Sequence, residues 1–130
     1  MQKILLLRIF AAAVWIGLSE FARNQIILRS YWILHYSKLG VPFPESPQNG
    51  AVWGIWSILF AFGIAALSRR FTWIQTTLLA WWFGFIMMWV VIGNLNVLPL
   101  GILPIAIPLS LLESTGAAWV LRSTVVQEAA

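Results

Sequence analysis

The sequence has no cysteine, one histidine and few charged residues, and each shortage excludes a class of protein. Without cysteine, the chain can form neither a disulfide framework nor a thiolate metal site. The single histidine, His35, excludes a bis-histidine haem or a multi-histidine metal centre within one chain. Charged residues make up only 9% of the 130 residues, whereas soluble globular chains contain about 25%. A soluble domain of this size could not cover its surface with so few charges, so we expect a membrane protein.

Motifs of common enzymes are also missing. We find no glycine-rich phosphate loop, no nucleophile elbow and no paired-histidine zinc motif. We therefore expect no metal and no cofactor, and an enzyme is not favoured. The net charge of +4 does not indicate nucleic-acid binding, because the basic residues are scattered between apolar segments, a pattern typical of contact with lipid headgroups.

Hydrophobic residues make up 61% of the sequence and concentrate in four runs. The runs cover residues about 4–24, 51–67, 71–92 and 100–121, and each has about the twenty residues that a helix needs to cross a bilayer. Strands of a membrane barrel would be about ten residues long with strict alternation, which is not seen. The sequence therefore predicts an all-α integral membrane protein, a single domain over residues 1–130 folded as a four-transmembrane-helix bundle.

The outer link between the first two runs, residues about 25–50, contains a further apolar stretch. Residues 23–36 have no proline or glycine and many large apolar side chains, so we expect a helix there. This helix either extends the first span beyond the bilayer or lies along the interface between spans one and two. Four side chains that suit the headgroup region are expected at the interface: Tyr31, His35, Trp53 and Trp56.

The positions of the basic residues predict how the chain is oriented in the membrane. Arg69 and Arg70 lie between the second and third runs, and four crossings place Lys3 and Arg122 on the same side. The positive-inside rule puts that side, and with it both termini, in the cytoplasm. Three basic residues weaken this bias without reversing it: Arg23, Arg29 and Lys38. From the short chain without targeting signals we expect a prokaryotic inner (plasma) membrane.

Glu113 is the most informative charged residue because it falls inside the fourth run. At 1.5 Å per residue, it lies about 20 Å from Leu100 and about 12 Å from Leu121. A carboxylate that faced lipid there would cost a few kcal/mol or more, so its side chain should face the bundle. Arg8 is the best basic partner by depth, so one hypothesis is a structural Arg8–Glu113 ion pair. The alternatives are a protonatable transport site and a contact within an oligomer.

Further polar residues interrupt the first run. Glu20 and Arg23 are close enough on a helix to pair, and Asn24 follows directly. Glu20 lies about 24 Å along a helix that begins at Ile4, near the outer edge of the hydrocarbon. These residues therefore mark the membrane exit, form a structural ion pair, or line a pathway for a ligand or ion.

The fourth run contains three prolines, which bend a membrane helix and leave carbonyl groups without helical partners: Pro99, Pro104 and Pro108. These carbonyls need partners from Asn94, Asn96, Ser110 or water, so the prolines either build a small polar cavity near the outer face or only kink the helix. The full set of candidates for a ligand or ion pathway is Glu113, Glu20, Arg23, Asn24, Ser110 and Asn94.

Three classes of function remain. The first is a transporter or channel for a small solute or ion, built as a homo-oligomer because four helices enclose little room for a pathway. The second is an accessory or structural subunit of a larger membrane complex, which the small size and missing motifs favour. The third, a membrane-interface enzyme, rests only on four residues: Glu20, Arg23, Asn24 and His35. Because ionisable residues inside a membrane usually mark function, we favour the first class.

Overall fold

The computed structural model describes residues 1–122, and every regular element in this range is helical. Four helices are long and apolar enough to cross a membrane: Gln2–Ile27, Pro47–Ser68, Trp73–Asn94 and Leu100–Leu121. Their ends differ from those of the four predicted runs by at most four residues. The prediction of an all-α chain with four long apolar helices is confirmed.

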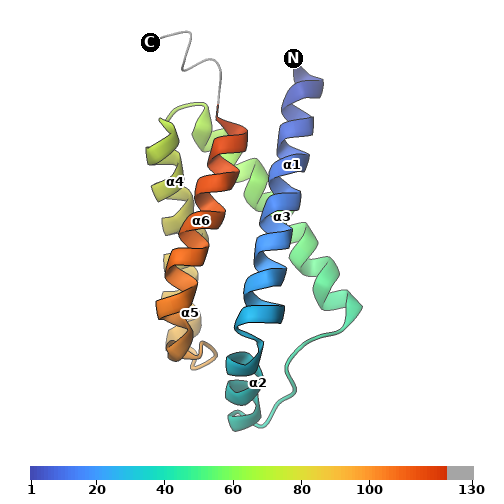
Figure 1. Cartoon of the computed structure of the whole chain (residues 1–130), viewed down its shortest axis with the longest axis vertical. Helices are drawn as coiled ribbons and strands as arrows, with labels where there is room; N and C mark the ends of the chain where they lie inside the picture. Colours follow the sequence, from blue (N-terminus) through green and yellow to red (C-terminus); the bar gives the residue numbers. More distant parts are fainter. Residues whose placement is uncertain (123–130) are drawn as a thin grey trace.

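The first long helix changes character before it ends. It consists of α1 (Gln2–Phe21) and a π-helical segment, η1 (Ala22–Ile27). Leu28 leaves the helical conformation, and α2 (Arg29–Lys38) follows below the end of α1 (Figure 1). α2 has no fully buried residue, and it lies beyond the first candidate span.

The next two long helices begin with side-chain caps. α3 (Pro47–Ser68) starts after Ser46, whose hydroxyl accepts a hydrogen bond from the backbone of Asn49. Thr72 caps α4 (Trp73–Trp81) in the same way. Such caps satisfy backbone groups that a helix end leaves free. α4 continues through a second π-helical segment, η2 (Trp82–Ile86), into α5 (Met87–Asn94).

The last long helix follows a tight turn. Asn96 takes a positive φ of 63° in this turn, a conformation that asparagine tolerates better than most residues. A short 3-10 turn, η3 (Leu100–Ile102), leads into α6 (Leu103–Leu121). Pro104 falls in the first turn of α6, where its missing N–H is harmless, whereas Pro108 lies inside the helix.

The helices pack so that α6 lies between α1 and α4, and α3 crosses behind α1 (Figure 1). α1 begins and α6 ends at the same end of the bundle (Figure 1), so these two helices are antiparallel. The candidate spans bury only 22% to 33% of their most apolar windows. Large apolar side chains therefore cover the outside of the bundle, a surface that suits lipid better than water.

Two separate clusters of buried apolar residues fill the bundle. The upper cluster, nearer the start of α1, is rich in alanine, which lets helices approach closely: Ile9, Ala12, Ala13, Ile16, Ala61, Ile64, Ala65, Ala80, Ala117, Ala118 and Leu121. The lower cluster, nearer α2, consists of Leu28, Leu98, Ile102 and Ala106. The first long helix with the Leu28 that follows it, and α6, contribute to both clusters, and their buried polar residues fall between the two.

Candidate functional site

A buried guanidinium joins two carboxylates between the two apolar clusters. Arg23 Nη2 lies 2.5 Å from Glu20 Oε1, and Arg23 Nη1 lies 2.6 Å from Glu113 Oε2. Arg23 and Glu20 are each 5% exposed, and Glu113 is completely buried. We call these three residues the charge network. It links the end of the first long helix directly to the middle of α6.

Neighbouring side chains fix the charge network in place. Asn24 Nδ2 donates to Glu20 Oε2 at 3.0 Å, and Trp32 Nε1 donates to Asn24 Oδ1 at 3.1 Å. Both oxygens of Glu20 are therefore bonded, one to Arg23 and one to Asn24. The ring of Phe85, which is also buried, lies 5.0 Å from the guanidinium carbon of Arg23, a favourable cation–π distance.

Both π-helical segments contribute to this site. Arg23 lies in η1, and Phe85, which covers it, lies in η2. A π-helical turn holds one residue more than an α-helical turn, so it changes the direction in which the following side chains point. These segments are often found at functional sites. Here, one segment carries Arg23 of the network and the other carries the ring that covers it.

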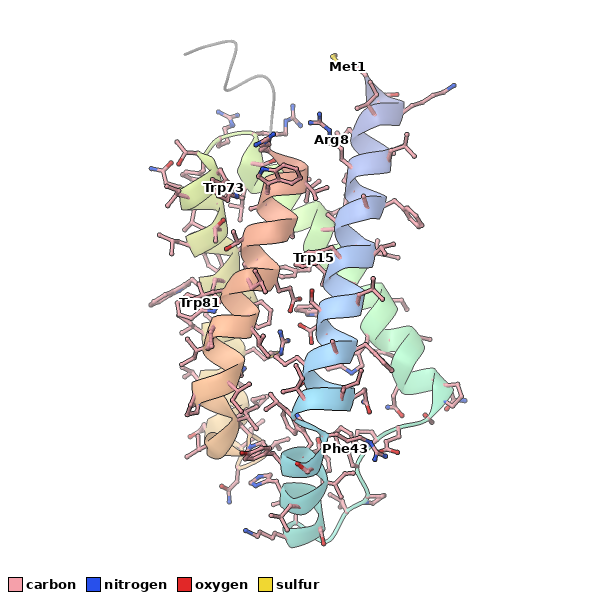
Figure 2. All side chains as sticks on the ribbon, in the orientation of Figure 1. Met1, Arg8, Trp15, Phe43, Trp73 and Trp81 are labelled. Carbon is pink, nitrogen blue, oxygen red and sulfur yellow. The ribbon has the colours of Figure 1, made fainter. Side chains whose placement is uncertain are left out.

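Trp15 connects α1 to α6 and lies nearer the start of α1 than the charge network does. Its indole Nε1 donates to the backbone carbonyl of Glu113 at 2.9 Å, and Figure 2 shows the side chain between the helices. Gly116 makes this approach possible, since a Cβ there would meet indole atoms of Trp15 at 2.5 to 2.9 Å. The backbone of α6 is therefore anchored at the residue that carries the buried carboxylate.

Further polar side chains lie between α6 and α4 at about the level of Glu113. We call these side chains, together with the charge network, the polar layer. Trp81 Nε1 donates to Ser110 Oγ at 2.9 Å, and Trp73 Nε1 donates to the carbonyl of Thr115 at 3.2 Å. Among the described residues, three buried side-chain atoms have no hydrogen-bond partner: Thr77 Oγ1, Glu113 Oε1 and Ser114 Oγ. Thr77 lies midway between the two tryptophans on α4, so all three atoms belong to the level of Glu113.

A cleft of about 420 Å³ reaches the charge network from the side of the outer loop. It lies between the end of the first long helix, residues 44–46 of the loop and the first turns of α3. Its polar wall includes Glu20, Asn24, Gln25, Glu45, Ser46 and Asn49. Glu20 is the member of the charge network that lines the cleft, and Glu113 lies behind it.

No family model, curated protein or solved structure matches this chain.

The charges of the network do not balance. Within residues 1–122, Arg23 is the one basic side chain in ion-pair contact with Glu20 or Glu113. With both carboxylates ionised, the network carries one excess negative charge, and burying an uncompensated charge is costly. A proton or a bound cation would neutralise it. Glu113 Oε1, which has no partner, is the atom with free capacity to accept one.

The predicted Arg8–Glu113 ion pair is wrong. Arg8 Nη1 instead donates to the backbone carbonyl of Arg122 at 3.2 Å, and Glu113 pairs with Arg23. Counting depth along the backbone ignored the direction of the side chains, which lean towards the start of their own helix. Because α1 and α6 are antiparallel, Arg23 and Glu113 lean towards each other, whereas Arg8 leans away.

The other predicted residues divide between the network and its surroundings. The Glu20–Arg23 pair exists, and Asn24 supports it. Ser110 lies in the same layer but bonds to Trp81, and Asn94 is exposed at the end of α5, away from the network.

The four residues predicted to lie at the membrane interface make contacts within the protein. His35 Nε2 lies 2.7 Å from the carbonyl oxygen of Asn96, and the ring of Tyr31 lies beside Gly101, so both tie α2 to the turn before α6. Trp53 lines the cleft. Trp56 packs on Phe60 and Phe85.

Sequence reasoning missed Trp32 and Phe85. Both are large apolar residues inside apolar runs, so their type gave no signal. Phe85 lies in one π-helical segment and Trp32 follows the other, and the sequence predicted neither segment.

Proposed function

We propose that the protein is a small membrane transporter in which Glu20, Arg23 and Glu113 form a protonatable site for a small solute or ion. One observation carries this proposal. The buried charge network has two carboxylates and one guanidinium, lies between two apolar clusters, and reaches an open cleft through Glu20. A purely structural ion pair needs neither the excess carboxylate nor the access from outside.

Occupancy of this site would be coupled to the contact between helices. A proton on Glu113 removes the excess charge and weakens the bond of Glu113 to Arg23, which holds α6 against the first long helix. The two protonation states then favour different arrangements of these helices. Such a difference is what a ligand needs in order to shift a conformational equilibrium.

The proposal places the chain in the lipid bilayer, with its termini in the cytoplasm of a prokaryotic cell. The apolar exterior of the bundle and the basic residues at one end support this placement. The cleft opens the site on the side of the outer loop, whereas the upper apolar cluster closes it towards the start of α1 within one chain. A continuous pathway therefore requires helix movement or a second copy, which supports a homo-oligomer.

Transport is tested in proteoliposomes that contain a pH-sensitive dye. A panel of small cations, anions and zwitterions is applied, and the internal pH is followed for the wild type and for Glu113→Gln. We expect at least one solute to drive a pH change that the variant lacks. Asn94→Ala, at an exposed position at the end of α5 that does not line the cleft, is the control with normal flux. If no solute moves protons in wild-type vesicles above the protein-free rate, proton-linked transport is refuted.

An accessory role in a larger membrane complex is the second candidate. The nearly complete pairing of the charge network favours it, because paired buried charges also fix helix positions without any transport. Native mass measurement after mild purification separates the two. A mass that is a multiple of 14.7 kDa supports the transporter, whereas stoichiometric foreign chains support the accessory role.

A further inference from the structure

The cleft has the size of a binding site for a small organic molecule. Its volume of about 420 Å³ falls within the range of roughly 300 to 1,000 Å³ that is typical of ligand pockets. Figure 1 shows why space exists here, since α3 diverges from α1 towards the loop end of the bundle. Gly50 and Gly54 of α3 line this space, and a Cβ on either would meet nothing within 4 Å.

The charge of the cleft favours a cation. Two carboxylates, those of Glu20 and Glu45, line it, and none of the described lining residues is lysine or arginine. Arg29 neutralises Glu45 at the exposed rim, at 2.6 Å. At the floor, Glu20 belongs to the charge network with its excess negative charge, and Arg23 sits behind it. A cation in the cleft would therefore approach unbalanced negative charge.

The start of α3 does not offer an anion site in competition. A helix N-terminus binds anions through free backbone N–H groups. Here Pro47 has no N–H, Asn49 donates its N–H to Ser46 Oγ, and Gly50 donates to the carbonyl of Ser46. Most of the donors that an anion would use are thus already occupied.

The cleft also has an aromatic wall. Trp53 lines it and is 42% exposed, and Phe21 contributes a second ring from the end of α1. Aromatic faces attract cations, tryptophan most strongly, and they contact the methyl or methylene groups of an organic ammonium ion. A metal ion or a strongly hydrated inorganic cation would gain little from such a wall.

We infer that this cleft binds a small organic cation with an ammonium group, which lies against Trp53 and neutralises the charge network through Glu20. This inference rests on the proposed function, because it names the substrate class of the same site. The ammonium group belongs either to a free solute or to a lipid headgroup at the membrane surface. Both sources offer the same chemistry to the cleft.

Calorimetry with choline and its uncharged isostere 3,3-dimethylbutanol tests the inference on the full-length protein in detergent. We expect choline to bind at least tenfold more tightly than the alcohol, which has the same shape without the charge. Glu20→Gln should weaken choline binding at least tenfold. Equal binding of the two probes, or unchanged binding to Glu20→Gln, would overturn the inference.

A second variant keeps the test independent of the charge network. Gly54→Leu fills the cleft, and we expect it to reduce choline binding at least tenfold. Gly63→Leu is the matched control, because Gly63 lies on the same helix with open space at its Cβ and does not line the cleft. It should bind choline as the wild type does. If Gly54→Leu also binds normally, the cation is not held in this cleft.

Nanodiscs distinguish the two sources of the ammonium group. If a lipid headgroup occupies the cleft, phosphatidylcholine nanodiscs should weaken the apparent affinity for free choline compared with nanodiscs of an uncharged glycolipid, which neither carries an ammonium group nor attracts choline to its surface. If a free solute is the ligand, the affinity should be the same in both. Binding without proton-linked flux would keep this inference and refute the proposed transport. If choline does not bind, and the Gly54→Leu variant still shows proton-linked flux, the proposed transport is kept and this inference is refuted.

Discussion

Arg23 is a single basic side chain shared by two acids that lie 93 positions apart in the sequence. Its removal leaves two buried carboxylates facing each other. The removal of either carboxylate leaves one neutralised pair. The three residues therefore contribute unequally to stability, although they form one network.

We predict that Arg23→Gln destabilises the protein by about 3 to 5 kcal/mol, the usual cost of leaving a buried charge without its partner. Thermal unfolding in detergent measures this loss. Arg29→Gln is the control, because the Arg29–Glu45 pair is exposed and solvent screening keeps such pairs below about 1 kcal/mol. Equal melting temperatures for the two variants would contradict the central role of Arg23.

We also predict that Gly116→Ala is destabilising, by about 1 to 3 kcal/mol, since overpacking at a close contact has this cost. The added methyl group would collide with the indole of Trp15 and strain its bond to the carbonyl of Glu113. Gly63→Ala places the same methyl group in open space and should melt at or slightly above the wild-type temperature. If the Gly116→Ala and Gly63→Ala variants melt at the same temperature, the contact between Gly116 and Trp15 is not tight.

At the residue scale, the sequence predicted which side chains are special but not how they pair. A charge inside an apolar run is visible in any hydropathy profile, so Glu113, Glu20 and Arg23 stood out. Their pairing depends on the direction in which each side chain leans and on the antiparallel contact of two helices. Composition and depth along a single helix contain neither kind of information.

At the scale of elements, the long helices were predictable and their π-helical interruptions were not. Runs of about twenty apolar residues predict spans through length alone. A π-helical turn differs from an α-helical turn by one residue, and the residues of η1 and η2 are ordinary in helices. Arg23 of η1 and Phe85 of η2 contact each other in the structure, a tertiary relation that a local reading of either segment does not contain.

We predict that deleting Ile26 converts η1 into a regular α-helix and rotates α2 by about 100°, the turn of one residue. The contacts of Trp32 with Asn24 and of His35 with Asn96 would then be lost. Hydrogen exchange of residues 29–38 should become faster. The substitution Ile26→Ala keeps the chain length at an exposed position and should leave exchange unchanged. Slow exchange in the deletion variant would show that η1 does not set the position of α2.

At the scale of the molecule, the helices form a bundle with an apolar exterior and polar residues inside and at the ends. Lys3, Arg69, Arg70 and Arg122 gather at the end where α1 begins, whereas α2 and the outer loop lie at the other end. The bundle therefore has one strongly basic end. By the positive-inside rule, this difference predicts that the basic end faces the cytoplasm.

We predict that Gln2→Cys is shielded from a membrane-impermeant maleimide in intact cells, and that Ser37→Cys is labelled. The chain has no native cysteine, so each variant reports a single position. A membrane-permeant maleimide should label both and serves as the control. The reverse labelling pattern would mean that the basic end faces outwards.

The contact of Arg8 with the carbonyl of Arg122 brings the start and the finish of the bundle to one end. Two copies could therefore be joined in tandem by a short water-soluble tether, with no added membrane segment and no inverted copy. If the working unit is a pair, one such fused polypeptide should be fully active, and placing Glu113→Gln in only one half would count the carboxylates that each turnover requires.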